Sequence, residues 1–491
     1  MLKWLNLKVK KYRERDMTRH GLFELILSLL ILTWVICLTF FQLFLRPYPG
    51  FSYTGNSGAV VQIHNHLSAA GQIQVGDKIL AINRVVFQES PSGWDFSPPL
   101  FSGYQPGDVI PMTIDRNEKV LEVQPVFSGP TWEEFIARLN SQWPMGLFFW
   151  LAGAMTLLFI RPRTLVSALM ALFFYLSAFW LSAGVISQIH VAWVAMAMRV
   201  AIWLTIPIYW HFLWYFPTPL GKLPRQIPWI VYSLGCLLAV VQTANLFPPS
   251  LYLAGFALAL LGSLALIVLH AILHRSERKE LTGLLIAAVI VLGPTIVMSL
   301  ATSLGPAAGS SIAAVTGFSA LPGYFFLTLI RGQVAGEGRL IPRLMRMYLA
   351  AILVEMVIAL ITVLILDWGV KLDINWILFL TSFLVLLTMM IGFAPFLILP
   401  ALSRTDILLP IVGERPLVIR ANRLAGDTAF FLLLFLAALA LFIGVSSVIP
   451  PRLAGIDLRR AGIKPGGPHR ADEGAFPGVV SGKDTRNATA P

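Results

Sequence analysis

The feature that most constrains this chain is a series of long apolar runs, each about as long as a helix that crosses a membrane. Crossing about 30 Å of hydrocarbon takes roughly 20 helical residues, and isolated strands would leave backbone amides unpaired in lipid. With 57% hydrophobic and only 13% charged residues among 491, the chain is predicted to be a multi-pass membrane protein. Ten runs are traced, at about 21–45, 144–160, 164–186, 191–216, 229–247, 251–273, 282–303, 311–330, 348–366 and 375–399.

The C-terminal part of the chain departs from this pattern. The segment 400–449 is predicted to be an inner segment with a possible extra span, an eleventh run at about 428–449. That run either crosses the membrane or lies at the interface, where it would keep the basic tail inside. The tail, 450–491, is dominated by Gly, Pro, Ala and Arg without any hydrophobic period, and is predicted to be disordered.

Lys and Arg mark every second loop, and this alternation predicts the orientation of the chain. Seven basic residues in the segment 1–20 precede the first span, so the positive-inside rule places the N-terminus in the cytoplasm. The region between the first and second spans is therefore predicted to be extracytoplasmic, at the cell (plasma) membrane. The later basic loops hold Arg161, Arg163, Lys222, Arg225, the segment 274–280, Arg331, Arg339, Arg343 and Arg346, whereas the loops around Gln188, Asn245 and Gly305 carry no Lys or Arg.

Between the first two spans, at about 50–130, the pattern changes to short strands with turn signals. The result is predicted to be a compact β-rich domain of roughly 80 residues, a common size for a small domain. Strands are predicted in GAVVQIHN (58–65), VGDKILAIN (75–83) and RVVF (84–87), a short helix or loop in SGWDFSPPLF (92–101), and a hairpin from PGDVIPMTID (106–115) and NEKVLEVQPVF (117–127) with its turn at Asp115 to Glu118.

This domain resembles a bacterial PDZ domain. The resemblance rests on the first strand, an Ala70-Gly71 break, the Val75-Gly76-Asp77 turn before ILAIN, and the later Pro106-Gly107-Asp108 turn. PDZ domains add an extended peptide to an open sheet edge, and backbone N–H groups cradle its C-terminal carboxylate. The resemblance implies a carboxylate loop at Pro49-Gly50-Phe51-Ser52; alternatively, these residues form only the hinge out of the membrane. The implied peptide-binding residues are Arg46, Gly50, Phe51, Ser52 and Tyr53.

Ionisable residues within spans are candidates for function because a charge at the centre of a span costs roughly 2.5–3.5 kcal/mol. Three are singled out as intramembrane polar candidates, Arg199, His211 and Glu355. A structural or snorkelling role is expected for each, including an Arg199–Glu355 pair. The sequence lacks a His-Glu-x-x-His zinc helix, a rhomboid-like serine site and a P-loop, so no catalytic residue, metal ligand or cofactor is predicted.

A second resemblance covers more of the chain, a basic-tipped span followed by an outer PDZ-like domain and a bundle of further spans. HFLWYFP (211–217) and GYFFLTLIRGQVAGEGRLIPRLMRMYLAAILVE (323–355) are similar to segments of the membrane sensor half of bacterial quorum-sensing competence-type sensor histidine kinases. After Pro400 this chain has neither the phosphoacceptor histidine helix nor the nucleotide-binding boxes of that family. The resemblance therefore implies a sensor without its own catalytic output.

Together these patterns predict a mainly α fold, a polytopic transmembrane bundle of about ten or eleven spans with one inserted β-rich PDZ-like domain. The predicted function is a membrane sensor or receptor whose PDZ-like domain binds a peptide or protein C-terminus. Membrane lipid and a separate cytoplasmic signalling partner are its other expected partners. A membrane scaffold or accessory subunit, which recruits a partner through that domain, is the alternative. The net charge of +12 is spread over short loops, so no nucleic-acid partner is predicted.

Overall fold

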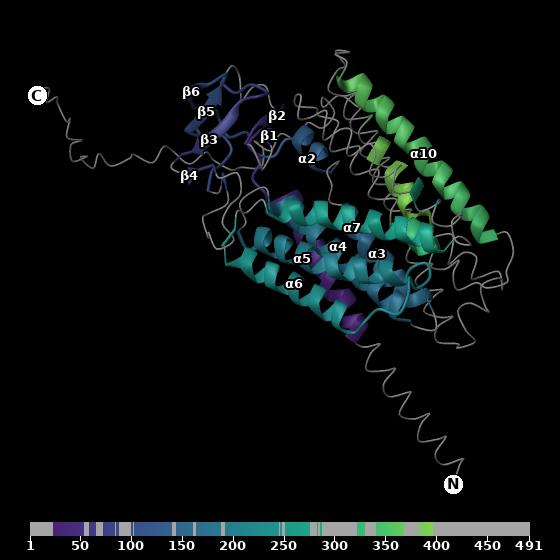
Figure 1. Ribbon diagram of the computed structural model, residues 1–491. Helices are drawn as coiled ribbons and strands as arrows, with labels where there is room; N and C mark the ends of the chain where they lie inside the picture. The colour runs from purple at the N-terminus through teal and green to yellow at the C-terminus, as the bar shows by residue number, and fades with distance from the viewer. Residues whose placement is uncertain are drawn as a thin grey trace, which may run out of the picture. The chain divides into compact units, whose positions relative to one another are not determined.

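A computed structural model of the chain (Figure 1) describes part of its length. The described residues are 23–53, 58–64, 72–83, 85–87, 100–101, 103–139, 144–160, 164–187, 192–244, 246–247, 251–274, 282, 285–286, 322–328, 340–367, 380, 383–385 and 387–395. The predicted segments 1–20, 400–449 and 450–491, together with most of the runs at 282–303 and 311–330, lie outside the described residues.

The described part is mainly helical, and five of its helices are long and apolar enough to cross a membrane. This confirms the coarse prediction of a chain built from apolar helices of spanning length. The five are Phe23–Leu45, which is the first span, Leu165–Ser187 (α4), Trp193–Tyr215 within α5 (Ala192–Tyr215), Gln226–Thr243 (α6) and Ala254–Leu273 within α7 (Leu251–Leu273).

Two further helices are not among these five. Helix α3 (Pro144–Phe159) has 16 residues, which makes it about 24 Å long at 1.5 Å per residue, shorter than the hydrocarbon core. Helix α10 (Leu340–Asp367) has 28 residues and begins well before the predicted start at 348. Arg343 and Arg346 end the apolar run, but both are good helix formers, so the helix continues through them.

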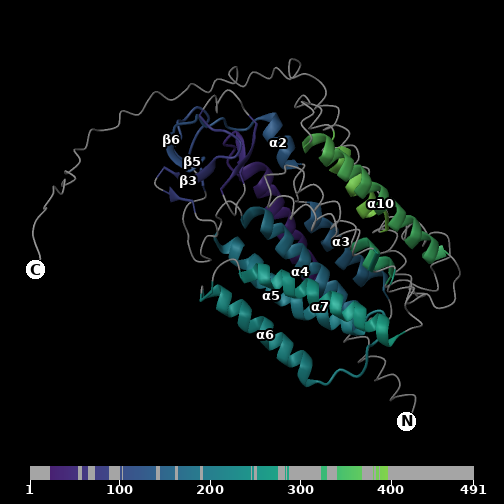
Figure 2. The ribbon, with the colours of Figure 1, turned by 45° about the horizontal axis from the view of Figure 1, so that its top comes forward.

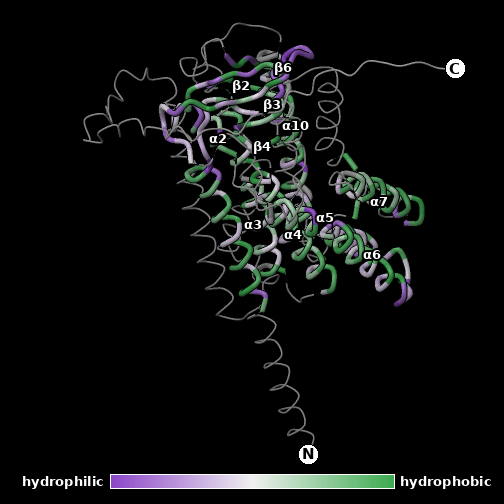
Figure 3. Tube along the Cα trace, turned by 90° about the vertical axis from the view of Figure 1, so that its left-hand side faces the viewer, coloured by the Kyte–Doolittle hydropathy of each residue, from purple (hydrophilic) through white to green (hydrophobic). Residues whose placement is uncertain are grey.

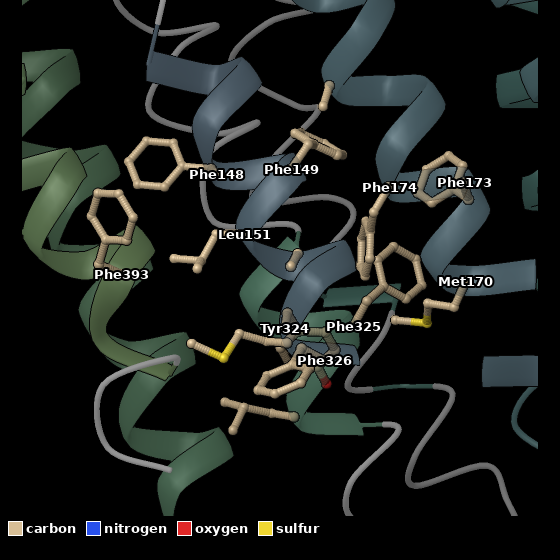
Figure 4. Packing of buried hydrophobic residues seen from close by; sticks show 14 of the residues in the cluster. Phe148, Phe149, Leu151, Met170, Phe173, Phe174, Tyr324, Phe325, Phe326 and Phe393 are labelled. Carbon is tan, nitrogen blue, oxygen red and sulfur yellow. The ribbon is translucent and has the colours of Figure 1, made fainter. Parts of the chain in front are cut away.

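The helices pack side by side around an aromatic core (Figures 1 and 2). Helix α4 contacts α3 and α5, and α5 also contacts α6 and α7. The tube in Figure 3 shows these helices to be hydrophobic over most of their length. In Figure 4, Phe148 and Phe149 of α3 lie in one hydrophobic cluster with aromatic side chains from α4 and from the helices at 322–328 and 383–395. The rings of Phe148 and Phe393 lie 4.6 Å apart.

Two tryptophans connect the first span to this bundle through hydrogen bonds and ring stacking. The ring of Trp34 stacks on Phe179 of α4 at 4.3 Å, and its indole N–H donates to the Phe179 carbonyl at 3.2 Å. The indole of Trp150 in α3 donates to the Ser28 carbonyl at 2.9 Å. Buried indoles combine a large apolar surface with one donor that needs a partner. The first span is therefore bound at two positions along its length, to α3 at Ser28 and to α4 at Trp34.

Six strands form the β domain between the first span and α3. They are β1 (Phe51–Tyr53), β2 (Val60–Ile63), β3 (Lys78–Ile82), β4 (Val85–Val86), β5 (Met112–Arg116) and β6 (Lys119–Val123). Strands β1 and β2 pair antiparallel, and the other four form an antiparallel sheet in the order β4-β3-β5-β6. The predicted strands are confirmed, and β1 is an addition to them. The stretch at 92–101 lies mostly outside the described residues.

The predicted β5–β6 hairpin is confirmed, with a tighter turn than expected. Arg116 pairs with Lys119, which leaves only Asn117 and Glu118 in the turn, with φ of 52° and 64°. Two consecutive residues with positive φ define a type I′ turn, whose twist matches that of the flanking strands.

A glycine allows the two sheets to lie close together. Gly58 has a φ of +70°, and a Cβ added there would lie 2.9 Å from the Ile79 carbonyl oxygen. The Gly58 carbonyl accepts from the Ile79 N–H at 3.0 Å, and the Val60 N–H donates to the Asp77 carbonyl at 2.8 Å. Phe51, Ile79 and the fully buried Ile110 share one hydrophobic cluster. The β domain therefore has a core of its own.

Two turns in this domain have the same Gly-Asp sequence and the same hydrogen bond, but their aspartates differ in burial, which allows a matched test. Asp77 and Asp108 each follow a glycine and accept a bond at 2.7 Å from the N–H three residues earlier, in Gln74 and Gln105. Asp77 is 2% exposed and also receives two 2.7 Å bonds from the Arg116 guanidinium, whereas Asp108 is exposed.

We expect Asp77→Asn to weaken the sheet β3–β5 by about 2 kcal/mol, because a charge-assisted buried pair is lost, and Asp108→Asn to cost less than about 1 kcal/mol. Native-state hydrogen exchange of the Ile114 amide in β5, measured on the full chain in lipid nanodiscs, tests this. Equal losses in the two variants would show that the Arg116 pair contributes nothing.

Candidate functional site

The first span ends in an unusual turn directly before the β domain. Residues Phe41–Leu45 form a π-helical turn, η1, in which the Arg46 N–H donates to the Phe41 carbonyl at 2.8 Å. A helix end leaves its last carbonyls without partners inside the helix. Single π turns occur frequently at functional sites. Here the carbonyls of the turn and of the following residues are bound by side chains from elsewhere in the chain.

Arg138 of α2 (Trp132–Leu139) provides most of those bonds. Its Nη1 donates to the carbonyls of Gln42 (3.4 Å) and Arg46 (2.8 Å), and its Nη2 donates to the Pro47 carbonyl and to Glu134 Oε1, the latter at 2.8 Å. All the hydrogens on both terminal nitrogens are therefore used. A cation at a helix C-terminus is also favoured by the helix dipole. Arg138 is 6% exposed.

An aromatic ring completes this contact. The Arg138 guanidinium carbon lies 3.5 Å from the centre of the Tyr48 ring, within the range of cation–π attraction. The Tyr48 hydroxyl in turn donates to the Leu43 carbonyl, and Ser128 Oγ donates to the Tyr48 carbonyl at 3.3 Å. Tyr48 therefore links the last turn of the first span to the end of the β domain.

Glu134 places a carboxylate in the loop that was predicted to bind one. Its Oε2 accepts from the Gly50 N–H at 3.0 Å, while Oε1 accepts from Arg138. Gly50 has a φ of 89°, which a residue with a side chain rarely adopts. Glu134 is 2% exposed. Burial raises the pKa of Glu134, whereas Arg138 and the Gly50 N–H lower it.

We call the residues Gln42–Gly50 together with Glu134 and Arg138 the joint. Residues 46–50 lead into the β domain, and α2 follows it on the way to α3. Both covalent connections of the β domain are therefore held to the last turn of the first span by one hydrogen-bond network. A displacement of either connection must strain or break bonds to a buried charge, which is costly.

A buried histidine lies beside the joint. Ser52 Oγ and His64 Nε2 are 2.7 Å apart, and the His64 backbone N–H donates to the Gly50 carbonyl at 2.8 Å. His64 is 4% exposed, and within the described part of the chain its Nδ1 has no hydrogen-bond partner. Burial lowers the pKa of His64 to about 4, and the nearby Arg138 and Arg46 act in the same direction. The imidazole is therefore neutral at neutral pH.

The structure brings the five predicted peptide-binding residues together, mostly out of contact with solvent. Gly50, Phe51 and Tyr53 are buried, and Ser52 and Arg46 are half-buried. Arg46 donates to Gln42 Oε1 at 3.3 Å within the last turn of the span. Within this loop the Gly50 N–H binds the carboxylate of Glu134, and a peptide-binding role for the five residues stays a prediction.

Four residues of this region were missed by the sequence analysis, namely Tyr48, His64, Glu134 and Arg138. His64 lies four residues after the buried Val60, so the strand period of two places both on the inner face. Glu134 and Arg138 are spaced i, i+4 in WEEFIARL, an ion-pair spacing in any helix. Those signals were present, but such pairs are usually solvated, and nothing in the spacing indicates burial.

The three intramembrane candidates do not form one site. His211 Nδ1 lies 3.0 Å from the hydroxyl of Tyr232 in α6. Arg199 of α5 is 2% exposed, and Glu355 of α10 is fully buried. Among the described residues neither carboxylate oxygen of Glu355 bonds to Arg199, so the predicted Arg199–Glu355 pair is wrong.

Within the described ranges, no three His, Cys, Asp or Glu side chains gather in a way that could hold a metal ion. Comparison of the chain with models of protein families, with curated proteins and with solved structures returned no match.

Proposed function

We propose that this protein is a membrane receptor whose β domain, PDZ-like in its strand and turn order, binds the C-terminal end of a peptide or protein and passes that event to the helical bundle. The observation that carries the proposal is the Arg138 network. It ties the predicted ligand loop at Gly50, both connections of the β domain and the last turn of the first span into one unit. A receptor needs such a connection, whereas a scaffold does not.

The sheet supports the binding half of the proposal. Within the described residues β1 pairs only with β2, and the proposal places the added strand at the other edge of β1. A peptide that runs antiparallel to β1 at that edge would direct its C-terminus toward Gly50, whose N–H already binds a carboxylate. Strand addition gives affinity through backbone bonds, and a carboxylate cradle gives selectivity for a free end.

The charge pattern of the loops supports the orientation. We place the N-terminus in the cytoplasm, the β domain outside the cell membrane, and ten or eleven spans in the bilayer, because Lys and Arg occur in every second loop. The basic segment 331–347 then faces the cytoplasm, where a separate signalling partner would bind. No catalytic output is assigned to the chain itself.

The test uses the full chain in nanodiscs and a pool of random hexapeptides, prepared with free and with amidated C-termini. We expect binding of free-end peptides at least about tenfold tighter than of amidated ones, which corresponds to about 1.4 kcal/mol for one charge-assisted contact.

A thiol in the proposed cytoplasmic segment reports on transmission. Gly336→Cys supplies it, in a chain whose own Cys37 and Cys236 are replaced by serine. A receptor should change its rate of thiol labelling when the peptide binds. Binding without a change in labelling would favour the scaffold alternative, and failure of both peptide pools to bind would contradict peptide recognition altogether.

A further inference from the structure

The contacts of Glu134 are those of a bound ligand rather than of a surface ion pair. Each carboxylate oxygen has its own donor, Gly50 N–H at 3.0 Å for Oε2 and Arg138 Nη2 at 2.8 Å for Oε1. One donor is a backbone amide in a positive-φ glycine turn, and the other is a guanidinium that is 6% exposed. Backbone amides combined with an arginine are the usual means of holding a carboxylate.

We infer that the space between Gly50 and Arg138 is a carboxylate-binding pocket that Glu134 of the same chain keeps closed, and that an external carboxylate binds there by displacing Glu134. The identity of that ligand, a peptide C-terminus, rests on the proposed function, but the pocket itself does not. At most one carboxylate can accept from the Gly50 N–H in this geometry, so internal and external groups compete.

The position of Glu134 makes the exchange feasible. It lies in the first turn of α2, where its backbone N–H donates to Thr131 Oγ1 at 3.3 Å. It is joined to the pocket only by its side chain, so a change of rotamer releases it while α2 stays in place. Arg138 keeps its bonds to the Gln42, Arg46 and Pro47 carbonyls throughout. A ligand carboxylate would then take over the charge balance of Arg138, so that the buried guanidinium has an anion in both the closed and the ligand-bound state.

The competition also lowers apparent affinity. A binding site that is open for only a fraction of the time shows an affinity reduced by that fraction. Removal of the Glu134 carboxylate should therefore tighten binding of free-end peptides and leave amidated peptides unchanged. Displacement would also free Glu134 on the helix that leads to α3, which couples occupancy of the pocket to the bundle.

The test is chemical rescue of Glu134→Ala in the full chain, with acetate as the probe. We expect the 46–53 segment to exchange its amide hydrogens faster in the variant than in the wild type. Acetate should slow this exchange by about tenfold when its concentration is ten times its Kd. Acetamide, which has the same shape without the charge, should have no effect. Glu134→Gln, whose side chain still fills the pocket, should not respond to acetate.

No slowing by acetate in Glu134→Ala, or equal slowing by acetamide, would overturn the inference. If the alanine variant does not fold, Glu134→Ser empties the same space and carries the same test. The acetate response does not depend on peptides. A chain that responds to acetate but binds no peptide would refute the proposed ligand and leave the pocket standing, and the reverse result would refute the pocket alone.

Discussion

Replacement of Arg138 by methionine is expected to destabilise the joint by about 3–5 kcal/mol, which is the usual cost of breaking a buried ion pair by removing one partner. Methionine keeps the length and most of the apolar contact of the side chain against the Tyr48 ring. It removes the bonds to the Gln42, Arg46 and Pro47 carbonyls and leaves the Glu134 carboxylate buried beside a single backbone donor. Local opening of the joint should then be at least about a hundredfold more frequent.

Hydrogen exchange of the 46–53 segment in the reconstituted full chain measures that opening. Arg46→Met is the matched control, because Arg46 is half-buried and bonds to Gln42 Oε1 at 3.3 Å within its own helix turn and to Tyr53, without a carboxylate partner in an ion pair; its expected cost is below about 1 kcal/mol. Arg138→Met combined with Glu134→Gln should be more stable than Arg138→Met alone, since no uncompensated charge remains. A double variant that is worse than the single one would show that the pair is not the unit that matters.

In the membrane part, the positions of the helices could be predicted from the sequence. Apolar runs of about 20 residues predict helices because backbone groups in lipid have no alternative partner, and α4, α5, α6 and α7 follow the predicted runs within a few residues. The ends are less predictable, as α10 shows. Its first turns contain Arg343 and Arg346. Their charge ends the apolar run, but the start of the helix is determined by helix propensity, which is high for arginine.

In the β domain, local sequence patterns predict the strands and the hairpin turn but not the contacts of the joint. The I′ turn at Asn117 and Glu118 and the strand β3 follow from turn residues and alternation, which are short-range signals. The joint cannot be predicted in that way, because Gln42 and Arg138 are 96 residues apart. Only the fold brings the end of a span, a glycine turn and an amphipathic helix together. The loop at Gly50 was predicted from a resemblance, but its occupant was not.

His64 offers a second test of the region, through the pH dependence of stability. The pKa of His64 is lowered from 6.5 to about 4 in the folded protein. Between these values the unfolded chain binds a proton that the folded chain excludes, so stability is complete above pH 6.5 and is lost as the pH falls toward 4. The loss expected from this group is about 3 kcal/mol, at 1.36 kcal/mol per unit of pKa. Glu134, whose pKa is raised by burial, acts with the opposite sign at the acid end of this range.

Comparison of variants separates the two groups. His64→Gln keeps a side chain that can bond to Ser52 Oγ but does not titrate, so the difference between wild type and variant isolates the histidine. Pulse proteolysis of the full chain in urea, from pH 4 to pH 8, should show the wild type losing about 3 kcal/mol more than His64→Gln over that range. Ser52→Ala is the control, since it removes the 2.7 Å contact and keeps the imidazole, and it should retain the acid sensitivity. Equal slopes for wild type and His64→Gln would mean that His64 is protonated without cost in the folded protein. In that case the site beside Gly50 would tolerate a further cation next to Arg138 and Arg46, which would contradict a joint whose stability depends on the pairing of Arg138 with Glu134 alone.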